Sequence, residues 1–143
     1  MGPSAPLPRS RTAHALRDLF GAPVAAGTVA CWVKRAALGV IEQVLPVIRD
    51  RITAAPVVNF DETGIRTDGR LAWLHSASTP TDVQTIRMPK LRIKVSGSMR
   101  TLTGAEHFAA IRSYTATAVR HGIGMLDALI QAATGNPWIP TTA

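Results

Sequence analysis

The amino-acid sequence predicts an α+β protein in which helices flank one β-hairpin and the C-terminal part is helical. Three features indicate this class: a long run of helical apolar periodicity before Pro56, an Asp68-Gly69 turn between two short apolar runs, and two further helical stretches near the end. A chain of 143 residues is long enough to bury one modest core, so a single domain is expected.

The first part of the chain predicts two helices. Residues 11–20 have an amphipathic pattern that Gly21 ends. Apolar residues then recur at steps of three and four over residues 29–52, with Thr28 as the expected N-cap. Pro46 removes one helical hydrogen bond, but the apolar face continues in phase on both sides of it, so one kinked helix is expected.

The middle of the chain predicts a hairpin that positions an acidic residue. Residues 57–60 form a short apolar run typical of a buried strand, which would place Asp61 at its end. Asp68-Gly69 is a strong hairpin signal, and residues 71–76 are expected to form the returning strand.

Two helices are expected after the hairpin. The first covers residues 103–119, where Thr103 and Glu106 have the spacing of a capping box. The second covers residues 124–134 and ends at Gly135. Its expected buried stripe consists of Met125, Leu126, Leu129, Ile130 and Ala133.

Basic residues outnumber acidic ones, 16 to 9, and the excess lies mainly in residues 83–143, which carry a net charge of +5. Clustered Lys and Arg side chains favour a polyanion such as DNA, because phosphate contacts release counterions. A surface that only keeps the protein in solution accounts for the charge equally well. The densest basic run comprises Arg87, Lys90, Arg92, Lys94 and Arg100. We expect this run to contact DNA, with a solvated edge strand as the alternative.

Other features exclude several classes of protein. Cys31 is the single cysteine, so no internal disulfide forms, and its apolar helical setting predicts a buried thiol beside a core Trp32. The start lacks the apolar segment of a signal peptide, and no apolar run reaches the ~18 residues of a membrane span. A cytoplasmic protein without a membrane partner is expected. The four histidines lie too far apart to predict a metal site.

Four acidic residues occupy the middle of the chain: Asp61, Glu62, Asp68 and Asp82. Phosphoryl transfer with two metal ions needs several carboxylates, and an aspartate that leaves a buried strand is suited to be one of them. The alternative is that Asp61 and the residues after it begin a turn. From this pattern, Asp61 is a candidate metal ligand.

Several short motifs follow one another along the chain. They are Arg11-Thr12-Ala13, Asp61-Glu62-Thr63-Gly64, Trp73-Leu74-His75, Lys94-Val95-Ser96-Gly97 and Gly135-Asn136-Pro137-Trp138. In this order they resemble the IS-sixty-six family of insertion-sequence transposases, and the resemblance extends from residue 9 onward. It divides the chain into a flexible lead (1–10), an N-terminal part of the transposase central domain (11–81) and a transposase C-terminal part (82–143).

The resemblance implies an RNase H-like fold and an Asp, Asp, Glu triad that uses Mg²⁺ to cut and join DNA. Asp61 falls on the first aspartate, as a catalytic residue and magnesium ligand. The glutamate position falls on Val83, so Asp82 beside it is the candidate substitute. In the family, a long stretch with the second aspartate follows the Trp-Leu-His strand, whereas here residues 77–86 lead directly to the basic run.

We therefore expect a truncated RNase H-like remnant: an inactive transposase of a bacterial insertion sequence with residual DNA binding. The DNA-binding and zinc-type region that precedes the central domain in the family is also expected to be missing. Two alternatives stay open. The chain could be an inhibitory module that pairs with a full-length transposase or with itself. In the other, Asp61 and Asp82 meet, within one chain or across a homodimer, and support weak Mg²⁺-dependent nicking of DNA.

Overall fold

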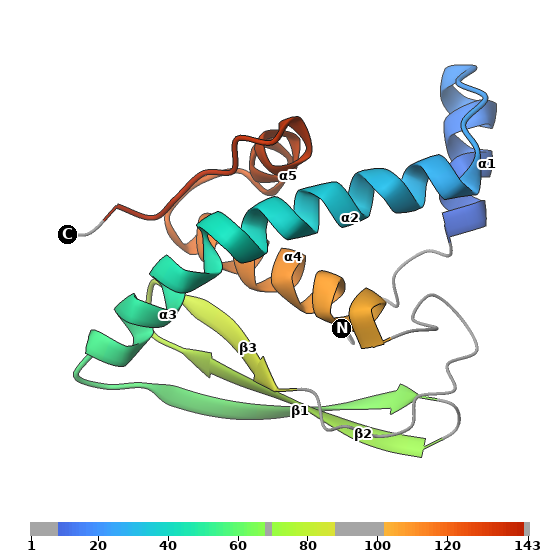
Figure 1. The fold of residues 1–143 in the computed structure, drawn as a ribbon. Helices are drawn as coiled ribbons and strands as arrows, with labels where there is room; N and C mark the ends of the chain where they lie inside the picture. Colours follow the sequence, from blue (N-terminus) through green and yellow to red (C-terminus); the bar gives the residue numbers. More distant parts are fainter. Residues whose placement is uncertain (1–8, 68–69, 88–101, 142–143) are drawn as a thin grey trace.

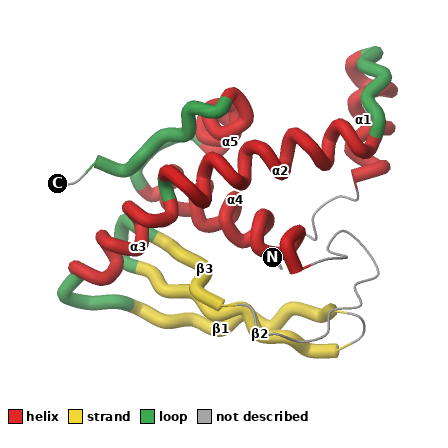
Figure 2. Tube along the Cα trace, in the orientation of Figure 1, coloured by secondary structure: helices red, strands yellow, loops and turns green. Residues whose placement is uncertain are grey.

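The computed structural model describes residues 9–67, 70–87 and 102–141, and these form a mixed structure of helices and one small sheet (Figure 1). The elements, in chain order, are α1 (Arg9–Phe20), α2 (Ala26–Gln43), α3 (Leu45–Ala54), β1 (Asn59–Thr67), β2 (Arg70–Ser78), β3 (Val83–Arg87), α4 (Leu102–Arg120) and α5 (Met125–Thr134). The helices lie on one side of the sheet, and no described element covers its other side (Figure 2). The expected α+β class is therefore confirmed.

Helices α2 and α3 occupy the stretch for which one kinked helix is predicted. The structure divides them at Val44, whose N–H still donates to the carbonyl of Val40 at 2.9 Å. Pro46 lies in the first turn of α3, where its missing N–H is tolerated. Helix α2 also begins before the expected N-cap, because the N–H groups of Thr28 and Val29 donate to the Ala25 carbonyl. Thr28 therefore lies inside the helix and does not cap it.

The sheet has three antiparallel strands in the order β1-β2-β3, so the prediction of one hairpin was incomplete. The first hairpin is confirmed, since Thr67 pairs with Arg70 across the connection, although residues 68–69 lie outside the described part. Ser78 pairs with Val83, and the four residues between them form the turn into β3. Within that turn the Thr79 N–H donates to the Asp82 carbonyl at 2.8 Å.

Helix α4 holds β3 through hydroxyl groups. The Thr117 hydroxyl accepts a hydrogen bond from the Val83 N–H at 3.0 Å, and the Ser113 hydroxyl accepts one from the Thr85 N–H at 2.9 Å. These contacts join positions about 30 residues apart in the chain, so the local sequence does not reveal them. They explain why residues 83–87 form a strand that the apolar pattern did not predict.

Strand β1 differs from the expected buried strand. It begins at Asn59 and not at Val57, so Asp61 is its third residue and does not follow its end. Phe60 is 75% exposed, and Val57 before the strand is 67% exposed. The reason is the position of β1 at the edge of the sheet, where the described helices do not cover it.

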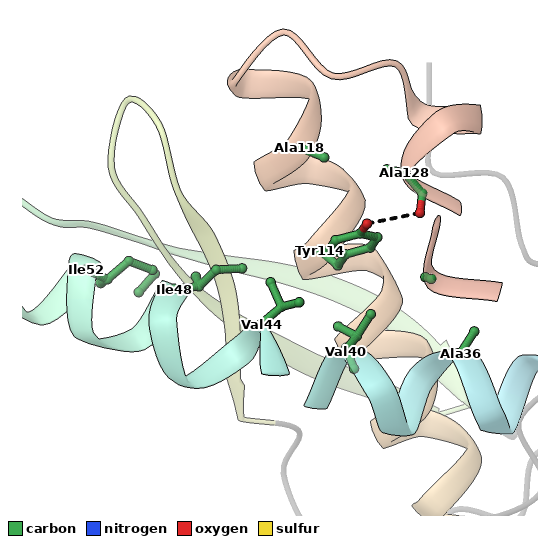
Figure 3. Close-up of a cluster of buried hydrophobic side chains, with 11 residues drawn as sticks. Ala36, Val40, Val44, Ile48, Ile52, Tyr114, Ala118 and Ala128 are labelled. Carbon is green, nitrogen blue, oxygen red and sulfur yellow. Dashed lines mark hydrogen bonds between the residues drawn. The ribbon is translucent and has the colours of Figure 1, made fainter. Parts of the chain in front are cut away.

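Segments from both halves of the chain share one hydrophobic core. It is built from buried residues of α2, α3, β2, α4 and α5: Ala36, Val40, Val44, Ile48, Ile52, Ala77, Ala110, Tyr114, Ala118, Ala128 and Ala132. Tyr114 lies at its centre, and its hydroxyl donates to the Ala128 carbonyl at 3.0 Å (Figure 3). The same hydroxyl accepts a hydrogen bond from the Trp138 N–H at 3.1 Å. Burial raises the pKa of Tyr114, so the hydroxyl stays protonated at neutral pH.

The buried face of α5 is not the one that the sequence predicts. Ala128 and Ala132 are buried, whereas the expected stripe is exposed, with Leu126 at 70% and Ile130 at 53%. Small side chains face the core because α5 packs closely against the Tyr114 ring. The left-handed conformation of Gly135, with φ of 88°, ends the helix as expected.

Two smaller predictions about the helices were also wrong. Cys31 and Trp32 are exposed, because the buried face of α2 runs through Val29, Ala36 and Val40. Helix α4 already begins at Leu102, so Thr103 lies inside it and is not a cap.

Candidate functional site

Asp61 lies in β1 and pairs with Ser76 of β2. Side chains alternate between the two faces of a strand. Because Ala77 belongs to the core and pairs with Phe60, Phe60 faces the helices and Asp61 faces away from them. Asp61 is exposed, and its carboxylate makes no hydrogen bond or ion pair with any described residue. The acid is therefore free to bind a cation or a partner, but nothing described holds it in one position.

Glu62 does not join Asp61, although it is the next residue. It lies on the opposite face of β1, and its Oε1 is 3.0 Å from Nδ1 of His75, the residue with which it pairs on β2. The Glu62 side chain is 61% exposed and that of His75 is 38% exposed, so water screens the attraction between them. The two neighbouring carboxylates thus cannot hold one metal ion together.

Asp82 is buried in the turn between β2 and β3, on the side of the helices. Nε of Arg51, from α3, donates to its Oδ1 at 3.0 Å, and the Thr81 hydroxyl donates to its Oδ2 at 2.7 Å. Its backbone N–H donates to the Thr79 hydroxyl at 2.9 Å. Burial raises the pKa of Asp82, but the bonds from Arg51 and Thr81 and the nearby charges outweigh this effect. The pKa is consequently below its ordinary value of 3.8, and the carboxylate is charged at neutral pH.

Residues after helix α4 lie close to the ion pair between Asp82 and Arg51. Nε2 of His121 lies 3.5 Å from Oδ1 of Asp82, and the His121 ring packs at 5.1 Å from the Trp138 ring. Nη1 of the same Arg51 guanidinium donates a hydrogen bond to the Thr141 carbonyl at 2.6 Å. Arg120 donates to the Thr79 carbonyl. Arg51 and His121 were not singled out from the sequence, because they are 31 and 39 residues from Asp82 and share no local motif with it.

The described acids do not fit a two-metal centre. Such a centre needs several carboxylates around ions about 3.5–4 Å apart. Asp61 faces away from the helices, whereas Asp82 faces them and is already bound by Arg51. Among the described residues, no group of three His, Cys, Asp or Glu side chains could hold a metal ion.

The basic run is only partly described. Arg87 is the last residue of β3 and pairs with His75, after an irregularity in the register between His75 and Ser76. The remaining candidates for DNA contact lie outside the described residues: Lys90, Arg92, Lys94 and Arg100. In the described part of the chain, no helix combines the length and apolar character needed to cross a membrane.

Comparison with known proteins identifies the family. The family model described as "Transposase IS66 family" matches residues 4–88, which is more than half of the chain. The chain therefore belongs to this family of DDE transposases, the IS-sixty-six family. No curated protein and no solved structure matches it. Membership gives the chain a transposase-related function and implies that it interacts with DNA, and the DDE class suggests use of a divalent metal.

Proposed function

We propose that this chain is a shortened DDE transposase that binds DNA. It does not cut and join DNA by itself, because it lacks the further carboxylates that would bind the metal ions. The observation that carries the proposal is the short turn of residues 79–82, through which β2 passes directly into β3. Only one acid, Asp82, lies between the Trp73-Leu74-His75 segment and the basic run. The ion pair of Asp82 with Arg51 keeps that acid from serving as a second metal ligand.

In this proposal the described structure is the remnant of an RNase H-like fold. The antiparallel order β1-β2-β3 and the placement of Asp61 on β1 support it. Residues 11–81 are the N-terminal part of the central domain and residues 82–143 the C-terminal part, joined through the shared core. The outer edge of β1 has no described partner strand, which is where a larger sheet would continue.

Asp61 has the proposed role of the first acid and Mg²⁺ ligand of the family, without the neighbours that the reaction needs. Asp82 has the proposed role of a structural anion that joins α3, the β2–β3 turn and the C-terminal segments. If Asp82 moved to a shared metal, Arg51 would keep a charge at 16% exposure without its partner, which is strongly unfavourable. This cost argues against the alternative in which the two aspartates meet.

Incubation of the purified protein with supercoiled plasmid and Mg²⁺ or Mn²⁺ tests the proposed inactivity. We expect no nicking above that of a mock preparation. Asp61→Asn and Asp82→Asn are the matched variants. Nicking by the wild-type chain that disappears in both variants would overturn the proposal and establish a paired role for the two aspartates.

A salt titration tests DNA binding by the basic run. The slope of log affinity against log salt reports the number of phosphates contacted, at about 0.9 per contact. Replacement of Lys90, Arg92 and Lys94 with Ala should therefore reduce the slope by up to ~3. Lys34→Ala with Arg35→Ala, on the exposed side of α2, is the control for loss of charge alone. An unchanged slope in the triple variant would assign the run to the solvated surface.

The exposed apolar face of α5 favours a second candidate function, in which the chain pairs with a full-length transposase and inhibits it. Leu126 and Ile130 are the most suitable sites for a test, because they are large, exposed and one helical turn apart. We expect Leu126→Asp with Ile130→Asp to abolish co-purification with an intact family member. Leu19→Asp, at 76% exposure on α1, is the control. No association of the wild-type chain would exclude this function.

A further inference from the structure

A pocket of about 490 Å³ lies between α3 and the helix-facing side of the sheet. Its floor is a row of residues that are paired across the three strands, Phe60, Ala77 and Gln84. Ile52 and Arg49 of α3 form part of its wall. The volume lies within the range of about 300–1,000 Å³ that is usual for small-ligand sites. The pocket therefore has room for a group of the size of one nucleotide.

Two polar side chains of the pocket, Gln84 and Arg49, have no hydrogen-bond partner in the described part of the protein. Gln84 is only 8% exposed, yet its side-chain amide makes no hydrogen bond with any described residue. Arg49 is exposed, and its guanidinium is likewise without a described acceptor. The amide atoms are themselves open to solvent in the pocket, because His121 Nε2 is the one fully buried side-chain polar atom without a partner among the described residues. A ligand that both donates and accepts at this position would satisfy the amide of Gln84.

Phe60 supplies an exposed aromatic surface in the lining of the pocket. Its side chain is on the helix-facing side of β1, but it is 75% exposed because no described element covers it there. An exposed aromatic ring with a cation nearby is a common arrangement for stacking an unpaired base and contacting its phosphate. The amide of Gln84 adds a donor and an acceptor that match the edge of a base.

We propose that this pocket binds one unpaired nucleotide of DNA. The base stacks on Phe60 and forms hydrogen bonds with the Gln84 amide, while Arg49 contacts a phosphate. A paired base cannot enter, because its edge is already bonded and its faces are stacked within the duplex. A second copy of the chain would fit less well, since it would bury the charge of Arg49. The inference depends on the DNA binding of the proposed function and adds the form of DNA that is preferred.

The test compares two duplexes of equal length, one fully paired and one with a single-nucleotide bulge that carries 2-aminopurine. We expect the wild-type protein to bind the bulged duplex about 5- to 150-fold more tightly, the range that stacking of one base provides. The 2-aminopurine fluorescence should change on binding. Phe60→Ser should abolish both effects and leave the affinity for the paired duplex unchanged, whereas Phe60→Trp should retain both.

Phe20→Ser is the matched control, because Phe20 is also 75% exposed but lies at the end of α1. It should keep the preference for the bulge. Equal binding of both duplexes by the wild-type protein would overturn the pocket inference and leave the DNA binding intact. Absence of binding to either duplex would overturn both. Sedimentation that showed a dimer lost in Phe60→Ser would overturn the inference in favour of a second copy as the occupant.

Discussion

The surroundings of Asp61, in strand β1, differ from those of Asp82, in the turn between β2 and β3 of the same small sheet. Asp82 is 2% exposed and is bound by Arg51 and Thr81, with His121 close by. Asp61 is exposed on an edge strand and has no described partner. A charge withdrawn from water requires partners, whereas a solvated charge does not. The Asp82 region is therefore built for stability, and the Asp61 region keeps a carboxylate available for binding.

The packing of the helices also differs between the surroundings of Asp82 and those of Asp61. The helices that enclose Asp82 also share the core around Tyr114, so the ion pair and the apolar packing stabilise the same assembly. Around β1, the apolar surface of Phe60 and the carboxylate of Asp61 are both open to solvent. We infer that substitutions near Asp82 mainly change the free energy of unfolding, and that those near Asp61 mainly change binding.

The largest effect on stability is expected for Arg51→Met. This change leaves the Asp82 carboxylate buried without its cation, so the free energy of unfolding should fall by about 3–5 kcal/mol. Chemical denaturation in urea measures it. Arg49→Met, at an exposed residue of the same helix, should change the free energy of unfolding by less than about 0.5 kcal/mol. Equal values for the two variants would contradict the structural role of the ion pair.

Tyr114→Phe should have the next largest effect. It removes the hydroxyl that donates to the Ala128 carbonyl and accepts from the Trp138 N–H, and both groups are left without that partner. We expect a loss of about 1–3 kcal/mol in the free energy of unfolding. Near-ultraviolet circular dichroism should show that the packing of Trp138 loosens. A loss no larger than that of an exposed control such as Val119→Ala would contradict this account.

Acid should reduce the stabilising effect of Asp82. Its pKa is lower in the folded than in the unfolded protein, so the stabilisation is complete above the unfolded value and is lost as the pH falls through the folded value, below about 4. The difference in free energy of unfolding between the wild type and Asp82→Asn should therefore shrink between pH 7 and about pH 3. Acidification should lower the free energy of unfolding by less than Arg51→Met does, because a protonated Asp82 can still form hydrogen bonds with its neighbours. If the difference in free energy of unfolding between the wild type and Asp82→Asn stays constant with pH, the charge of Asp82 does not stabilise the fold.

The smallest effect on stability is expected for Asp61→Asn. The exposed carboxylate has no described partner, so the free energy of unfolding should change by less than about 0.5 kcal/mol. Urea denaturation of this variant beside Asp82→Asn makes the comparison direct. A loss equal to that of Asp82→Asn would show that Asp61 also holds the fold together.

Short-range patterns in the chain were sufficient for the presence of the helices and of the first hairpin, but not for the break at Val44, the N-caps or the buried face of α5. The apolar repeat over residues 29–52, the glycines Gly21 and Gly135, and the pairing across Asp68-Gly69 each depend on neighbours within a few positions. Such signals come from backbone conformation and from the helical and strand periods, which are local properties. The run Asp61-Glu62-Thr63-Gly64 could also be compared with the family motif because it is contiguous, and the role of Asp61 as the first aspartate stays a prediction.

Long-range packing accounts for what the sequence did not predict. Strand β3 depends on hydroxyl groups of Thr117 and Ser113, about 30 residues away, and the burial of Asp82 depends on Arg51. The face of α5 that is buried follows from close approach to Tyr114, which favours small side chains over the larger apolar ones. The surroundings of a residue depend on which distant segments contact it. The local sequence around Asp61 and Asp82 does not predict those contacts. That is why Asp61 in a strand and Asp82 in a nearby turn of the same sheet have such different environments.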